Sequence, residues 1–157
     1  MSDTIGGSLK TGTPGQGSRD AVVAYAILRL SLGANIMLHG VSRLLAGQPA
    51  LLAYLTHYFE KTPVVPASVL PAFAYALPPV EATLGLLLAL GLATRFSLIA
   101  GGLVMACLVV GTNLAQDWSV AGLQLIYCFI YYHLLAHRDL NIISVDAKLR
   151  GGGKETQ

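Results

Sequence analysis

The sequence has few charged residues for its length. Aspartate, glutamate, lysine and arginine make up 11% of the 157 residues, whereas hydrophobic residues make up 54%. A water-soluble domain of this size covers its surface with more charge than ten basic and eight acidic side chains provide. The composition therefore favours a membrane protein, because lipid removes the need for a charged surface.

Features that mark other protein classes are also scarce. The formal net charge is only +2, which is far from the concentrated basic surface that nucleic-acid binding requires. The two cysteines form no CxxC motif, and the sequence has no metal-ligand spacing, no phosphate-binding glycine loop, no haem attachment motif and no Ser-His-Asp pattern. We therefore expect no nucleic-acid partner, no bound metal, no catalytic residues and no catalytic activity of the chain on its own.

Four long apolar stretches are what the sequence does contain. Each approaches or exceeds the roughly 20 residues that a helix needs to cross about 30 Å of hydrocarbon. They predict an all-α fold, an integral membrane four-helix bundle with spans at residues 21–46, 72–93, 96–115 and 118–136. The short connections after the second and third stretches predict antiparallel helix hairpins.

The remaining segments lie around and between these spans. Residues 1–20 are rich in glycine, serine and threonine, a composition that predicts a flexible tail. Residues 47–71 form a long loop, and its apolar and aromatic run at 51–59 predicts a short interfacial helix. The transmembrane domain of residues 21–137 is followed by a polar segment, 138–157, for which we predict a second tail without a further helix.

Lysine and arginine are distributed unevenly around the spans. Four spans put both termini on one side of the membrane, and that side carries seven basic residues, whereas the other side carries only Arg43 and Lys61. The positive-inside rule then places both termini in the cytoplasm and the long first loop outside. We expect a multi-pass protein of a prokaryotic inner membrane.

The first span contains polar residues that are costly in lipid. With a rotation of about 100° per residue, they all fall within one sector less than half the helix wide. They are Arg29, Ser31, Asn35, His39, Ser42 and Arg43. Ionisable side chains at membrane depth normally face a protein interior or a water-filled cavity, so this stripe predicts a polar pocket that opens toward the outside.

The other spans supply partners for this stripe. Glu81 in the second span lies at a depth that matches His39 and Arg43 in an antiparallel neighbour. A charge in low dielectric is tolerated when it is paired, so we predict an ion pair between Arg43 and Glu81 with His39 beside it. The fourth span adds Gln124 and Tyr127. Two interpretations stay open: a functional pocket, or an ion pair that only locks the bundle.

Small residues recur at a four-residue spacing in the second and third stretches. This pattern lets membrane helices approach closely, within the bundle or against a partner. We predict helix-packing positions at Gly85, Ala89, Ala93, Gly102 and Ala106.

Short motifs of the first two spans and the turn that follows occur in a characteristic order. They are Arg29-Leu-Ser-Leu-Gly33, His39-Gly40 with Arg43-Leu44, Pro79-Val-Glu81, and the run from Gly85 to Gly91-Leu-Ala-Thr-Arg95. Together they resemble the DoxX family of small four-helix membrane proteins, over about residues 25–132. The resemblance implies a role as a subunit or partner of an oxidoreductase, because related proteins include a subunit of a thiosulfate:quinone oxidoreductase.

The sequence and this resemblance lead to one expected function. We expect a small accessory or quinone-proximal subunit of a membrane redox complex, with the lipid bilayer and other membrane-complex subunits as partners. The chain has no ligand set for haem, iron–sulfur or flavin, so electron transfer through it requires quinone at the polar pocket. Two alternatives stay open: a purely structural or assembly subunit of a larger membrane complex, and a small solute or proton permease.

Overall fold

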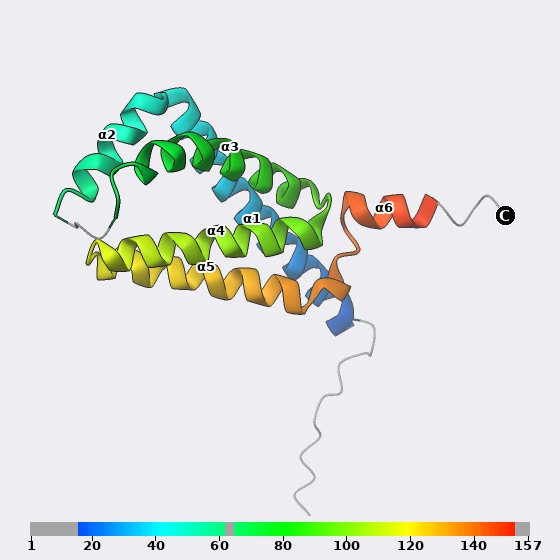
Figure 1. The fold of residues 1–157 in the computed structure, drawn as a ribbon. Helices are drawn as coiled ribbons and strands as arrows, with labels where there is room; N and C mark the ends of the chain where they lie inside the picture. The colour runs from blue at the N-terminus through cyan, green and yellow to red at the C-terminus, as the bar shows by residue number, and fades with distance from the viewer. Residues whose placement is uncertain (1–15, 62–64, 153–157) are drawn as a thin grey trace, which may run out of the picture.

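The computed structural model describes residues 16–61 and 65–152, and in these residues it contains helices and no strand. Four of the helices are long and apolar enough to cross a membrane, which confirms the predicted all-α membrane fold. In chain order the elements are α1 (Gln16–Ala46), α2 (Gln48–Tyr58), α3 (Val69–Leu90), α4 (Thr94–Leu114), α5 (Trp118–Ala136), the 3-10 turn η1 (Arg138–Leu140) and α6 (Val145–Gly152), as Figure 1 shows.

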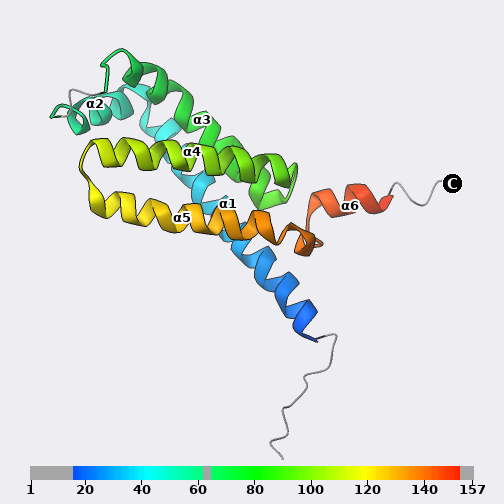
Figure 2. The same ribbon diagram turned by 60° about the horizontal axis from the view of Figure 1, so that its bottom comes forward.

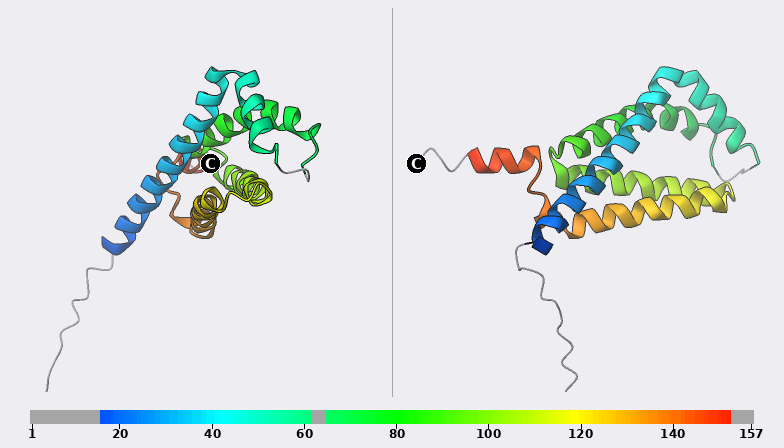
Figure 3. Two further views of the ribbon diagram at one scale, coloured as in Figure 1. Left: turned by 90° about the vertical axis from the view of Figure 1, so that its left-hand side faces the viewer. Right: turned by 180° about the vertical axis from the view of Figure 1, so that it is seen from behind.

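The long helices form a bundle with two distinct ends. α4 and α5 run antiparallel side by side, and α1 crosses α3 at an angle, as the views in Figures 2 and 3 show. We call the end that holds the start of α1, the α3–α4 turn and α6 the terminal end. The opposite end, where α2 lies beside the start of α3, is the α2 end.

The outer surface of the bundle is apolar. Large hydrophobic side chains such as Ile27, Leu103 and Phe129 are exposed on three different long helices. The core between the helices is filled by residues such as Leu88 and Leu98, which are almost fully buried. A hydrophobic interior with a hydrophobic exterior is the pattern expected of helices surrounded by lipid.

The contact between α1 and α3 depends on glycine. A Cβ added at Gly40 would lie 2.2 Å from the backbone nitrogen of Ala82, and one added at Gly33 would lie 2.4 Å from that of Ala89. From the other side, a Cβ at Gly85 would lie 2.2 Å from a backbone nitrogen of α1. The two backbones are therefore in direct contact, which only residues without a side chain permit at these positions.

The other predicted packing positions lie in different surroundings. Ala93 lies outside the helices, exposed in the α3–α4 turn with a φ of 47°. Ala106 is exposed on α4, and a Cβ at Gly102 would make only ordinary contact with Tyr131, at 3.7 Å. The close approach on α4 is at Gly101, where a Cβ would lie 2.5 Å from the Tyr131 hydroxyl.

The helix boundaries differ from the prediction mainly at the two ends of the chain. α1 begins at Gln16, before the predicted start at residue 21, and the rest of the predicted N-terminal tail lies outside the described residues. After α5 the chain forms η1 and α6, where we had predicted no further helix. The reason is a long-range contact: Asp146 of α6 accepts hydrogen bonds at 2.8 Å from the backbone N–H groups of Ala93 and Thr94.

The distribution of basic residues predicts which end of the bundle faces the cytoplasm. Arg19, Arg95, Arg138, Lys148 and Arg150 all lie at the terminal end. A reporter that is active only on the side of the membrane away from the cytoplasm should therefore be silent when fused after residue 157 and active when inserted near Lys61. The reverse pattern would show that the terminal end faces outward.

Candidate functional site

An ion pair links α1 and α3 in the half of the bundle toward the α2 end. Arg43, one turn before the end of α1, donates from Nη1 to Oε2 of Glu81. The Glu81 side chain is only 6% exposed and that of Arg43 is 31% exposed. The close approach of the two backbones at Gly40 brings Arg43, three residues further along α1, within reach of α3.

His39 does not join this pair. It is exposed on α1, and its Nδ1 lies 2.9 Å from the carbonyl oxygen of Asn35, one turn earlier in the same helix. Arg43 follows His39 by one helical turn and lies about 40° around the helix from it, so the two side chains are neighbours on α1. Within the described residues His39 forms no ion pair with Glu81, and its bond is to the backbone of its own helix.

Asn35 and Tyr127 bond to each other at a different place from the ion pair. The side-chain amide of Asn35 donates to the hydroxyl of Tyr127 at 3.1 Å, which links α1 to α5. Gln124, also on α5, accepts a hydrogen bond of 2.8 Å from the hydroxyl of Thr112 on α4. The predicted polar residues thus form separate helix-to-helix bonds and not one cluster.

Arg29 lies near the middle of α1, and its side chain reaches the terminal end of the bundle. Fourteen residues of helix, or about 21 Å, separate it from Arg43. Its guanidinium donates to the carbonyl oxygens of Leu88, of Ala89 at 3.0 Å and of Ile143 at 2.9 Å. These are carbonyls of the last turn of α3 and of the segment before α6, so Arg29 binds the negative end of α3 and joins three segments of the chain.

A cavity of about 250 Å³ lies at the α2 end, between α2, α3, α4 and α5. Most of its wall is apolar, with Leu55, Leu70, Phe73 and Leu108 among the lining side chains. Its polar lining includes Arg43, Thr112 and Gln124. Two of the predicted pocket residues, Arg43 and Gln124, therefore meet on one cavity, and Thr112 is a member that the sequence analysis missed because threonine is common in membrane helices.

A hydrogen bond holds α2 over this cavity. The hydroxyl of Tyr58 donates to Oδ2 of Asp117 at 2.9 Å, across the gap from α2 to the α4–α5 turn. Burial, and then the bond to Asp117, raise the pKa of Tyr58 to about 12. Hydrogen bonds from the Val120 N–H and from Tyr58 hold the pKa of Asp117 below its ordinary value. The donor and the acceptor therefore keep their roles across the neutral pH range.

The polar groups on the cavity wall include a guanidinium, a hydroxyl and an amide. Among residues 16–61 and 65–152, no group of three or more histidine, cysteine or acidic residues is placed to hold a metal ion. Cys107 lines the cavity but is a free thiol, as is Cys128. An apolar wall with a few polar groups is the usual form of a site that fixes a small organic molecule by one polar end.

The amino-acid sequence matches one family model across most of the bundle. The model described as methylamine utilisation protein MauE matches residues 21–121, which is more than half of the chain. The chain belongs to the MauE family. MauE is a family of multi-pass membrane proteins, which agrees with the four membrane-spanning helices here. No curated protein and no solved structure matches the chain.

The MauE match refines what the sequence motifs had indicated. The motifs predicted DoxX, which the comparison does not show; the family that it shows is MauE, a similar class of small multi-pass membrane proteins. The matched residues include both partners of the ion pair, Arg43 and Glu81. Gln124 and Tyr127 on α5 lie beyond the matched region.

Proposed function

We propose that this MauE-family protein is an accessory subunit of a membrane redox complex that takes part in methylamine utilisation, and that its cavity at the α2 end binds a quinone head group. The family description supports the first part. The cavity supports the second part, because it combines an apolar wall with the polar groups of Arg43, Thr112 and Gln124. This cavity is the observation that carries the proposal.

The polar groups of the cavity match the chemistry of a quinone, which presents carbonyl acceptors on a flat apolar ring. Arg43 has five N–H donors, of which the bond to Glu81 accounts for one. Gln124 uses its oxygen to accept from Thr112, which leaves the amide N–H donors of Gln124 for a ligand. Glu81 acts as a positioning residue, because it fixes the guanidinium of Arg43 beside the cavity.

The volume and the borders of the cavity support binding of the head group only. A space of about 250 Å³ suits a single ring with its substituents and not a long tail. Cys107, Val69 and Val120 line the cavity and are also exposed on the outer surface. A polyprenyl tail therefore leaves between the helices into lipid, while the ring stays against the polar groups.

Removing the free amide donor of the cavity tests the quinone site. In the double variant Thr112→Val with Gln124→Leu, the affinity for a short-chain quinone analogue should fall roughly fivefold, since one hydrogen bond of about 1 kcal/mol from the Gln124 amide is lost. The fold should be kept, because Thr112 and Gln124 bond to each other and both are replaced by apolar groups of similar size. The measurement is ligand titration of the purified protein in detergent.

His39→Gln is the matched control, because His39 is a polar residue of the same half of the bundle that lies outside the cavity. It should leave the affinity for the quinone analogue unchanged. Unchanged affinity of the double variant for the quinone analogue would contradict the proposed quinone site. If methylamine-dependent quinone reduction in membranes were then also normal, and the complex dissociated only when this chain was deleted, the protein would be a purely structural subunit.

A further inference from the structure

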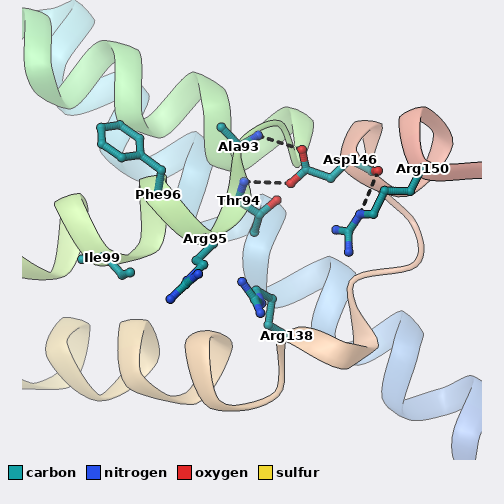
Figure 4. A pocket seen from close by; sticks show the side chains of 8 residues that line it. All are labelled: Ala93, Thr94, Arg95, Phe96, Ile99, Arg138, Asp146 and Arg150. Carbon is teal, nitrogen blue, oxygen red and sulfur yellow. Dashed lines mark hydrogen bonds between the residues drawn. The ribbon is translucent and has the colours of Figure 1, made fainter. Parts of the chain in front are cut away.

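A second cavity lies at the terminal end of the bundle, away from the site described above. It is open, has a volume of about 510 Å³ and is formed by the start of α4, by η1 and by α6 (Figure 4). Three arginines from these three elements line it: Arg95, Arg138 and Arg150. Figure 4 shows Arg95 and Arg138 pointing toward the same space between the start of α4 and the end of α5.

The arginines have no anionic partner within the described part of the chain. The ion pairs there are those of Arg43 with Glu81 and of His57 with Glu60, and none involves these arginines. All three are exposed, and Arg150 donates only to the backbone oxygen of Asp146 in its own helix, at 3.2 Å. Their charges are therefore available to an external anion.

Asp146 is the one carboxylate that lines the cavity, and both of its oxygens already accept hydrogen bonds from the backbone. Its two oxygens accept from the N–H groups of Ala93 and Thr94 at 2.8 Å, so it caps the start of α4. Burial opposes its ionisation, but these hydrogen bonds and the nearby Arg150 hold the pKa of Asp146 below its ordinary value. Asp146 therefore holds α6 against the bundle and places Arg150 on the same cavity as Arg95 and Arg138. The lining of the cavity thus carries three positive charges and one negative charge.

The remaining wall of the cavity is apolar and leads into the membrane. Phe96 and Ile99, in the first two turns of α4, line it and are 64% and 41% exposed. Leu103, one turn further along α4, is 64% exposed. The cavity lies where two membrane-spanning helices have their ends, α4 at Thr94 and α5 at Ala136, which is the depth of the lipid head groups.

We propose that this cavity binds the head group of an anionic phospholipid. The arginines bind the phosphate, because guanidinium groups match phosphate oxygens with paired hydrogen bonds. The acyl chains then lie along Phe96, Ile99 and Leu103. Basic pockets at the ends of membrane helices are the common form of anionic-lipid sites, and here the bound lipid would join α4, α5 and α6.

The test compares two double variants of the full chain that lose the same charge. Arg95→Gln with Arg138→Gln removes two cavity arginines, whereas Arg19→Gln with Lys148→Gln removes two exposed cations at the same end that do not line the cavity. Binding of phosphatidylglycerol, with phosphatidylcholine as the reference lipid, is measured by native mass spectrometry of the protein from mixed micelles. The cavity variant should bind phosphatidylglycerol roughly 25-fold more weakly, about fivefold per arginine, and the control should change less than twofold.

Three results would overturn the proposal: no preference of the natural sequence for phosphatidylglycerol, equal losses in both variants, or full displacement of the lipid by inorganic phosphate at equal concentration. The last would identify a soluble-anion site without a lipid. Phe96→Ala further distinguishes a phospholipid from a free phosphate ion as the ligand, because it should weaken binding of the lipid and leave binding of inorganic phosphate unaffected. Should the double cavity variant fail to accumulate, Arg150→Gln alone must give the fivefold loss, since Arg150 is exposed and donates only within α6.

Discussion

Replacing Arg43 by leucine is expected to lower the free energy of unfolding by about 3–5 kcal/mol, or to prevent accumulation of the protein. The substitution leaves the carboxylate of Glu81, whose side chain is 6% exposed, without its partner in the membrane. Glu81→Leu should cost less, because Arg43 is 31% exposed and its long side chain can extend toward the head groups at the α2 end. Denaturation in mixed detergent micelles measures both.

The double variant Arg43→Leu with Glu81→Leu should recover most of the lost stability, because two apolar side chains replace two charges in an apolar site. Glu60→Ala is the matched control, since it removes a carboxylate from the His57–Glu60 pair, whose side chains are 88% and 68% exposed. It should change the free energy of unfolding by less than about 0.5 kcal/mol. If the effects of the Arg43 and Glu81 substitutions simply added, the pair would contribute nothing to stability.

The spans could be predicted from the sequence because the signal for them is local. A run of about 20 apolar residues can satisfy its backbone in lipid only as a helix, whatever its neighbours are. The fourth predicted span, 118–136, has the same limits as α5. The depths of Arg43 and Glu81 followed in the same way, because two antiparallel helices of known limits fix the height of every residue on them.

The surroundings of a residue could not be predicted, because they depend on which helix covers which face. A helical wheel gives the angle of His39 around α1, but it does not say that α1 packs mainly on α3 and leaves His39 exposed. Gly33 and Gly40 contact α3 only because their partners there, Ala89 and Ala82, lie at the crossing point. Neither relation is contained in the spacing of residues on a single helix.

The helix α6 and the basic cavity beside it could not be predicted for a related reason. Residues 145–152 are polar and would not form a stable helix in isolation, since a segment this short gains too few hydrogen bonds. α6 forms against the bundle, through the bonds from Ala93 and Thr94 to Asp146, more than 50 residues further along the chain. The basic cavity depends on the same contact, which brings together Arg95, Arg138 and Arg150 from three different elements. Nothing in the sequence relates these three arginines to one another.

Gly85→Ala is expected to lower the free energy of unfolding by about 3 kcal/mol or more, the upper end of what an added methyl group costs in a packed interior. The new Cβ would lie 2.2 Å from the backbone nitrogen of Met37 and 2.7 Å from the carbonyl oxygen of Gly33. These are backbone atoms and cannot rotate away, so α1 and α3 must separate. Thermal denaturation in detergent measures the loss.

Gly122→Ala is the matched control for this contact between α1 and α3. Gly122 also lies inside a membrane-spanning helix, α5, but a Cβ there would have nothing within 4 Å. The control should be neutral or stabilise the protein by up to about 1 kcal/mol, because alanine favours a helix more than glycine does. Both variants add one methyl group to a helix interior, so the difference between them isolates the close approach of α1 and α3. Equal effects would mean that the two helices do not depend on glycine to meet, and that Arg43 reaches Glu81 without it.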